Sequence, residues 1–287
     1  MKLRFWGVRG STPTPGREYL KYGGNTSCLE LRANGNMILL DCGSGLRELG
    51  KAWVREFHGK PLKAFIFLTH YHWDHIQGIP FFEPLYNPEN QFHFHCFSTG
   101  GATVRDALEG QMTNPYFPVD MNQMKAHRSF RRLGEESIEF HGVRVTAKHL
   151  FHPQGCLGYR VETNSEVIVY ATDNEAGDRA GDRNLRELAQ GADVLIYDAQ
   201  YTPEEYDSHR KGWGHSTWRH GAQIAAECGV KELILFHHDP DHHDSFLDQV
   251  LPEAQAAFPS TRISAEGMEI EVSAAGTERI RYTTVNK

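Results

Sequence analysis

Three histidines and one aspartate fall within six residues of one another, at His70, His72, Asp74 and His75. If this segment is extended or turning, His70 and His72 lie on the same side of it. Asp74 and His75 can then reach a neighbouring point. Imidazole and carboxylate groups are the ligands that zinc and similar borderline cations prefer. His and Asp are also common in surface turns, but this density of ligand types predicts a metal site.

Three apolar runs each lead into residues that can bind a metal. Residues 64–68 precede the histidine motif, residues 167–172 precede Asp173, and residues 233–236 precede His237. Short apolar runs of this kind are typical of buried strands. Open α/β sheets bind ligands at the carboxyl ends of their strands. Asp173 or His237 alone would suit an ordinary turn, but their joint occurrence predicts one site at a common sheet edge.

Short apolar runs bounded by turn residues recur along the chain and predict strands. They cover residues 3–8, 27–32, 37–41, 64–69, 92–97, 143–147, 158–162, 167–171, 194–198 and 233–236. Apolar residues at helical spacing predict helices over 46–57, 217–228 and 245–257, the last with Ser245 as its N-cap. The sequence shows neither an internal repeat nor a Pro/Gly/Ser-rich linker. We expect a single α/β domain over residues 1–287, with sheets sandwiched between helices.

The composition is that of a globular protein and limits the classes of partner. The net charge of −7, from 30 Lys and Arg against 37 Asp and Glu, disfavours a general nucleic-acid or anionic-membrane surface. No segment approaches the roughly 20 apolar residues that a membrane helix needs. The five scattered cysteines, without a Cys-x-x-Cys pair, suit a reducing compartment. We expect a cytoplasmic protein without a membrane partner.

Several motifs together carry a family resemblance. They are the His-x-His-x-Asp-His motif at 70–75 and the segments 5–11, 22–28, 40–43 and 236–240. Over roughly residues 1 to 250 the chain resembles the metallo-β-lactamase-fold hydrolases, and it is nearer to their phosphodiesterase and tRNA 3′-processing branch than to the lactamases. This resemblance implies a four-layer αββα sandwich with two divalent metal ions at one edge of the paired sheets.

The resemblance also implies a set of metal ligands. The first metal would be held by His70, His72 and His152, the second by Asp74, His75 and His237, with Asp173 bridging the two. His149 is an alternative to His152, because both precede the segment Gly158-Tyr159-Arg160. His238 is likewise an alternative to His237. Zinc is the expected metal and manganese the second choice, because both accept this ligand set.

The implied reaction is hydrolysis of a phosphodiester. Two metal ions can hold a bridging hydroxide as the nucleophile and stabilise the phosphoryl oxygens. Residues 214–217 resemble the family's His-Ser-Thr motif, which lactamases lack, and this makes His215 the expected acid for the leaving oxygen. We name His215 and Asp74 as the catalytic residues. Asp74 acts as a metal ligand and not as the general base, because a coordinated carboxylate is a poor base.

Two features of the sequence indicate the substrate class: its net charge, and the lack of a recognisable tRNA-binding arm. A small anionic phosphodiester is expected, with a cyclic nucleotide as the leading candidate. A tRNA 3′-end endonuclease is the alternative, but we see no Gly/Pro-rich arm for tRNA, and the negative charge makes nucleic acid an unexpected partner. Residues 100–132 are the one candidate insertion and could form a lid or a dimer contact. The family resemblance also implies a possible homodimer. A non-catalytic metal-binding module would predict a broken ligand set, yet every position is filled.

Overall fold

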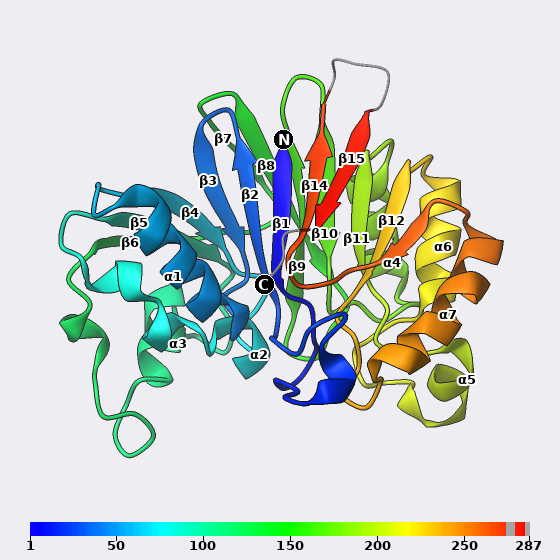
Figure 1. Cartoon of the computed structure of the whole chain (residues 1–287), viewed down its shortest axis with the longest axis horizontal. Helices are drawn as coiled ribbons and strands as arrows, with labels where there is room; N and C mark the ends of the chain where they lie inside the picture. Colours follow the sequence, from blue (N-terminus) through cyan, green and yellow to red (C-terminus); the bar gives the residue numbers. More distant parts are fainter. Residues whose placement is uncertain (274–278, 285–287) are drawn as a thin grey trace.

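The computed structural model describes residues 1–273 and 279–284, and in this part of the chain the strands form two mixed sheets (Figure 1). One sheet has eight strands in the order β15 (Ile280–Thr284), β14 (Met268–Val272), β1 (Lys2–Gly7), β2 (Cys28–Ala33), β3 (Asn36–Leu40), β4 (Lys63–Phe67), β5 (Gln91–Cys96) and β6 (His127–Arg132). The other has seven in the order β13 (Thr261–Ile263), β12 (Glu232–Phe236), β11 (Val194–Asp198), β10 (Val167–Ala171), β9 (Cys156–Glu162), β8 (Val143–Leu150) and β7 (Ser137–Phe140).

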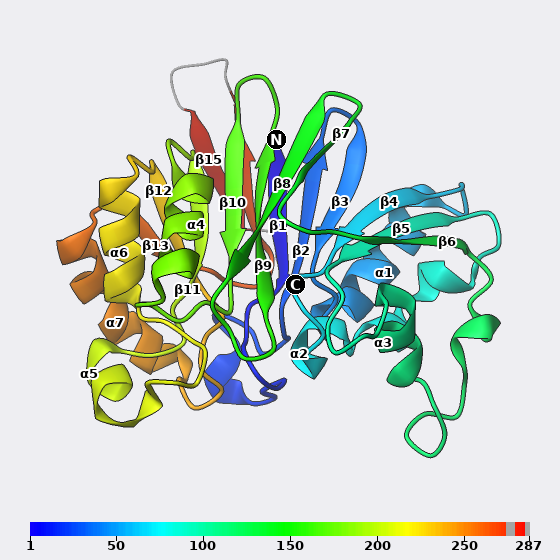
Figure 2. The same ribbon diagram turned by 180° about the vertical axis from the view of Figure 1, so that it is seen from behind.

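Helices cover the outer face of each sheet. α1 (Gly45–Phe57) and α3 (Val104–Gly110) pack on the eight-stranded sheet, while α4 (Arg179–Ala189), α6 (Trp218–Glu227) and α7 (Asp244–Ala257) pack on the seven-stranded one. Figures 1 and 2 show these helices on opposite flanks of the paired sheets. The short α2 (Trp73–Ile76) and α5 (Pro203–Glu205) lie at the lower edge in Figure 1. The expected four-layer αββα sandwich is confirmed.

The layers follow from the two-residue period of the strands. On β10, Ile168 and Tyr170 join the core cluster that both sheets share, while Val169 joins the cluster beneath the helices. On β11, Ile196 faces the shared core and Leu195 the helices. Because successive side chains of a strand point to opposite faces, a central strand covered on both sides must be apolar throughout. This explains why the inner strands read as continuous apolar runs.

All ten predicted strands and all three predicted helices are present, and the structure adds elements that were not predicted. The helix predicted from residue 245 begins at Asp244, and His243 rather than Ser245 caps it, because the His243 side chain accepts from the Phe246 amide. Strands β6, β7, β13, β14 and β15 and helices α2 to α5 were missed. β6 and β7 are edge strands with mostly exposed or half-buried residues, which do not form apolar runs. Residues 127–132 of the predicted insertion thus belong to the sheet. Among the described residues, none of the helices is both long and apolar enough to cross a membrane.

Candidate metal centre

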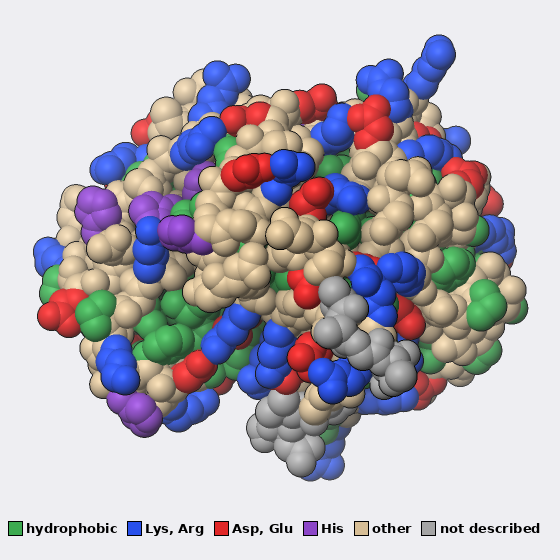
Figure 3. Space-filling model, turned by 90° about the horizontal axis from the view of Figure 1, so that it is seen from above, with side chains coloured by type: hydrophobic (Ala, Val, Ile, Leu, Met, Phe, Trp, Pro, Cys, Tyr) green, Lys and Arg blue, Asp and Glu red, His purple; other side chains and the backbone are tan. Residues whose placement is uncertain are grey.

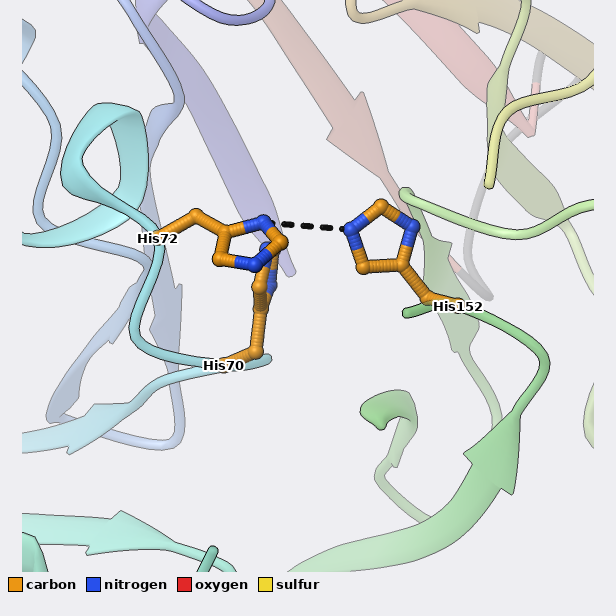
Figure 4. A group of neighbouring side chains, drawn as sticks. All are labelled: His70, His72 and His152. Atoms are coloured by element: carbon orange, nitrogen blue, oxygen red, sulfur yellow. Dashed lines mark hydrogen bonds between the residues drawn. The ribbon is translucent and has the colours of Figure 1, made fainter. Parts of the chain in front are cut away.

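Two groups of side chains converge at the lower edge of the paired sheets, and together they contain the predicted ligands. The first group is His70, His72 and His152. His72 Nδ1 lies 3.2 Å from His152 Nε2, and the His70 ring lies beside both (Figure 4). His70 and His72 come from the segment after β4, whereas His152 comes from the turn between β8 and β9. The site therefore joins the two sheets.

The second group contains Asp74, His75, Asp173 and His237. His237 Nε2 lies 3.3 Å from His75 Nε2 and 3.2 Å from Asp74 Oδ2. Asp173 lies between the groups: its Oδ1 is 3.7 Å from His70 Nε2, and its Oδ2 is 3.2 Å from His75 Nε2. One carboxylate oxygen thus faces each group, which is the placement that a bridging ligand requires.

The backbone turns sharply where it delivers these side chains. Asp41, Asp173 and His237 follow β3, β10 and β12, and each has a positive φ, at 60°, 52° and 63° respectively. Left-handed backbone is uncommon for residues other than glycine, and such conformations cluster at functional sites. The turn lets each strand stop at the edge while its next side chain points into the site.

Partners behind the site fix the histidine rings. Asp41 Oδ2 accepts a hydrogen bond from His75 Nδ1 at 2.8 Å, and the Gly214 carbonyl accepts one from His152 Nδ1 at 2.7 Å. Gln200 Oε1 accepts from His237 Nδ1 at 2.9 Å. A histidine that donates one ring N–H to such a partner presents the lone pair of its other nitrogen to a metal. Each of these three rings therefore directs Nε2 into the site.

The donor set fits two divalent ions. His70 Nε2 is buried and has no hydrogen-bond partner in the described residues. Burial lowers the pKa of His152 to about 4 and the pKa of His70 well below its usual value, so that both rings are neutral, the form that binds metal. Ligand atoms on a tetrahedral zinc ion lie roughly 3.4 Å apart, given bond lengths of about 2.1 Å. The separations of 3.2 to 3.7 Å within and between the two groups match this spacing.

His215 lies beside both ligand groups and is held by a carboxylate. Asp198 Oδ2 accepts a hydrogen bond from His215 Nδ1 at 2.9 Å, and His215 Nδ1 lies 3.9 Å from Asp173 Oδ1. Burial alone lowers the pKa of His215, but the charge of Asp198 outweighs it and raises that pKa to about 9. The charge of Asp198 thus favours the protonated form of the His215 ring. This ring can give a proton to an oxygen in the adjoining cleft.

The two alternative histidines point elsewhere. His149 is exposed on β8, and its ring packs edge-on against Phe97. His238 is buried, and its Nε2 donates to the Ser264 carbonyl at 3.0 Å, away from the ligand groups. The structure brings His152 and His237 to the site and leaves these two outside it.

Sequence reasoning missed the carboxylates that support the site. Asp41 is fully buried and, besides His75, accepts hydrogen bonds from the Thr69 amide and the Tyr170 hydroxyl. Asp198 is also fully buried and accepts from the Asn174 amide as well as from His215. Both residues stand at the ends of predicted strands, so the signal that pointed to Asp173 was present for them too.

A cleft of about 430 Å³ opens over the two groups. It is lined by Ser11, Tyr71, His72, Trp73, Asp74, Asp173 and His215. The Ser11 amide donates to Asp74 Oδ2 at 2.7 Å, which orients this carboxylate. A small substrate in the cleft would contact both ligand groups and His215 at once.

Comparison with known proteins places this site in a family. The family described as "Beta-lactamase superfamily domain" matches residues 36–238, which is more than half of the chain and includes all seven predicted ligands. The chain belongs to the β-lactamase superfamily. The predicted family and the prediction of a metal-dependent hydrolase are thereby confirmed.

Individual members of the superfamily match this chain over nearly its whole length. A ribonuclease Z from Haloarcula marismortui is 25% identical over 316 positions, covering 95% of this chain and 97% of the relative. The metallo-β-lactamase fold protein YhfI from Bacillus subtilis has a TM-score of 0.69 at 19% identity, covering 93% of this chain and 97% of that one. The short form of human tRNase Z has a TM-score of 0.66 at 22% identity, covering 94% and 99%. These structural likenesses confirm the metallo-β-lactamase fold.

Proposed function

We propose that the protein is a dimetal phosphodiesterase that hydrolyses a small phosphodiester, with a cyclic nucleotide as the leading candidate. The observation that carries this proposal is the placement of His215, with its Asp198 partner, beside two ligand groups that share Asp173. Seven converging ligands favour an enzyme over a non-catalytic metal-binding module. We propose zinc as the metal because imidazoles predominate, with manganese second.

His70, His72, His152 and Asp173 would hold one metal ion, and Asp74, His75, His237 and Asp173 the other. When bound, the pair supplies Lewis-acid activation of water and stabilises negative charge on the phosphoryl oxygens. The chain itself supplies the proton. The Nδ1–H of His215 donates a hydrogen bond to Asp198. The proton on Nε2 is therefore the one that His215 can give to the leaving oxygen of a substrate in the cleft.

Charge and chain length support a small substrate. The net charge is −7, and basic and acidic side chains are interspersed on the face opposite the site (Figure 3). A long polyanion is bound through an extended basic surface. The alignment with the H. marismortui ribonuclease Z runs over 316 positions, whereas this chain has 287 residues, so the relative carries segments that this chain lacks.

The second candidate function is cleavage at the 3′ end of tRNA. It is favoured by the name ribonuclease Z of relatives that match 95% of this chain. The two candidates share the metal site and the acid, and they differ in what binds outside the cleft. That nucleic acid is not a partner, that the protein is cytoplasmic and that it forms a homodimer stay predictions.

Purified, metal-loaded protein tests the proposal against bis(p-nitrophenyl) phosphate. We expect turnover with about two metal equivalents per chain. His215→Ala should keep both metals and lose about 10²-fold or more in kcat, because general acids contribute 10²–10⁴-fold. Loaded protein without phosphodiesterase activity would contradict the proposal. A panel of cyclic mono- and dinucleotides with unprocessed tRNA then separates the two candidates.

A further inference from the structure

An apolar groove of about 710 Å³ continues from the cleft over the metal centre. The groove and the cleft share two side chains, Tyr71 and Trp73. One wall is formed by α2 and the turn that follows it, including Phe81. The other wall comes from residues 107–117, which follow β5 in the chain. A ligand bound at the metals can therefore extend into the groove without a break.

The walls of the groove present aromatic rings to solvent. Trp73 is 78% exposed, Tyr116 82% and Phe81 56%. Phe81 is held edge-on by Phe117, with ring centroids 5.7 Å apart. Adjoining exposed apolar side chains in a concave surface mark binding sites rather than ordinary surface. The rings provide flat faces on which a planar group can stack.

One polar group in the wall of the groove lacks a partner. The Nε2 atom of Gln111 is buried and makes no hydrogen bond to any described residue. Gln77, the other amide of the groove, differs because it donates to Thr26 Oγ1 at 3.0 Å. A buried, unpaired amide N–H is costly and calls for an acceptor. Glutamine amides recognise the hydrogen-bonding edges of nucleobases.

The lining excludes a charged occupant. It consists of Tyr71, Trp73, Ile76, Gln77, Pro80, Phe81, Ala107, Gly110, Gln111, Tyr116 and Phe117. This set contains neither Lys, Arg or His nor Asp or Glu. A second phosphate would find no cation here, and a cationic group would find no carboxylate. A neutral, planar group with a polar edge matches both the rings and the amide.

We infer that this groove binds the nucleobase of a nucleotide phosphodiester while its phosphate lies at the metal centre. Trp73 and Tyr116 supply stacking surfaces, and the Gln111 amide, once its side chain turns toward the groove, donates to an acceptor on the base. Trp73 lies between the proposed ligands His72 and Asp74, so the same short segment positions both metal and base. The inference rests on the proposed phosphodiesterase function, and it adds a defined binding site for the base of a nucleotide substrate.

The activity test compares two esters with the same leaving group on the metal-loaded enzyme. Thymidine 5′-(p-nitrophenyl phosphate) carries a base, and methyl p-nitrophenyl phosphate does not. Base stacking is typically worth a factor of about 10 or more in affinity. We expect Trp73→Ala and Tyr116→Ala each to lower the kcat/KM ratio of the nucleoside ester to the methyl ester roughly tenfold. Gln111→Leu, which keeps the bulk of the side chain, should lower the same ratio.

Val54→Ala is the matched control, because Val54 is an exposed apolar side chain on α1 outside the groove. It should leave the ratio of the two esters unchanged. Metal content is measured for every variant, since Trp73 adjoins the ligands. An unchanged ratio in both Trp73→Ala and Tyr116→Ala would overturn the inference.

A binding test separates this inference from the proposed function. If the wild-type enzyme hydrolyses neither ester, the phosphodiesterase proposal fails, but base binding can still be measured by equilibrium dialysis. We expect adenosine 5′-monophosphate to bind the loaded protein more tightly than ribose 5-phosphate, and Trp73→Ala to remove this difference. Equal binding of the two would overturn the inference. Displacement of the bound nucleotide by 3′,5′-cyclic AMP identifies a free nucleotide as the occupant, whereas displacement by a short single-stranded RNA alone identifies an RNA end.

Discussion

Asp198 Oδ2 accepts a hydrogen bond from His215 Nδ1 at 2.9 Å, and the Asp198 side chain is fully buried behind the histidine. This relationship fixes the direction of the ring, and the charge of Asp198 is the main reason that the pKa of His215 is raised to about 9 despite burial. Asp198 is therefore a positioning residue, which acts on the substrate through His215.

Asp198→Asn should lower kcat while leaving KM and metal content nearly unchanged. The amide keeps the shape of the side chain but removes the charge that holds the proton on His215. Loss of such a supporting partner typically costs about 10- to 100-fold. Steady-state kinetics with bis(p-nitrophenyl) phosphate and metal analysis measure the effect. Glu253→Gln, the same change on the exposed surface of α7, is the control. A variant that loses its metals would show that Asp198 serves the metal site instead.

Asp173→Ala should lose metal and turnover together. Its two oxygens face different ligand groups, with Oδ1 3.7 Å from His70 Nε2 and Oδ2 3.4 Å from His237 Nε2. Removing it takes one ligand from each proposed ion. Metal analysis after dialysis should find fewer equivalents than in the wild type. His149→Ala is the control, because His149 lies outside the site. Retention of both metals by Asp173→Ala would refute the bridging role.

Local apolar patterns predicted the strands that lead to Asp173 and His237, whereas the four layers and the full ligand set were implied by the family resemblance. The apolar runs at 167–171 and 233–236 are buried except for the half-buried Val167, and they lead to Asp173 and His237 at the common edge. The choice between His149 and His152 depended on the hairpin of β8 and β9. In that hairpin Leu150 pairs with Cys156, so that His152 falls in the turn and His149 on the strand. Histidine spacing alone does not encode this register.

Long-range packing created the features that the sequence did not predict. Asp41 and Asp198 stand at the ends of predicted strands, and Asp173 follows a strand in the same way. The role of Asp41 and Asp198, however, depends on which histidine ring the fold places beside each of them. The groove is lined by both Trp73 and Tyr116, which lie more than 40 residues apart in the chain. No periodic pattern in the sequence marks this shared lining.

Asp41→Asn should weaken metal binding more than it weakens folding. Asp41 Oδ2 accepts from His75 Nδ1 at 2.8 Å, and this bond directs His75 Nε2 toward Asp74 and Asp173. Partners of ligating histidines typically contribute 10- to 100-fold in metal affinity. Competition with a chelator of known affinity measures the change. Circular dichroism of the metal-free variant shows whether the fold survives, and a wild-type affinity in a folded variant would contradict the assignment.

His95 should make the protein less stable as the pH falls from 7 to 5. Its ring is buried against Phe67, with centroids 4.6 Å apart, and burial lowers its pKa from the usual 6.5 to about 4. Because the folded-state pKa lies below the unfolded one, the unfolded chain binds the extra proton between these values. Stability from the neutral ring is therefore present above pH 6.5 and decreases toward pH 4, by about 2 kcal/mol between pH 7 and pH 5.

His95→Phe keeps an aromatic ring on Phe67 and removes the titrating group. Urea unfolding at pH 7 and pH 5 should show a smaller loss of stability for this variant than for the wild type. The other titrating groups contribute equally to both proteins and cancel in the comparison. His127→Phe, the same change at an exposed position on β6, is the control and should keep the wild-type loss. An equal loss in His95→Phe and wild type would show that His95 does not couple folding to pH in this range.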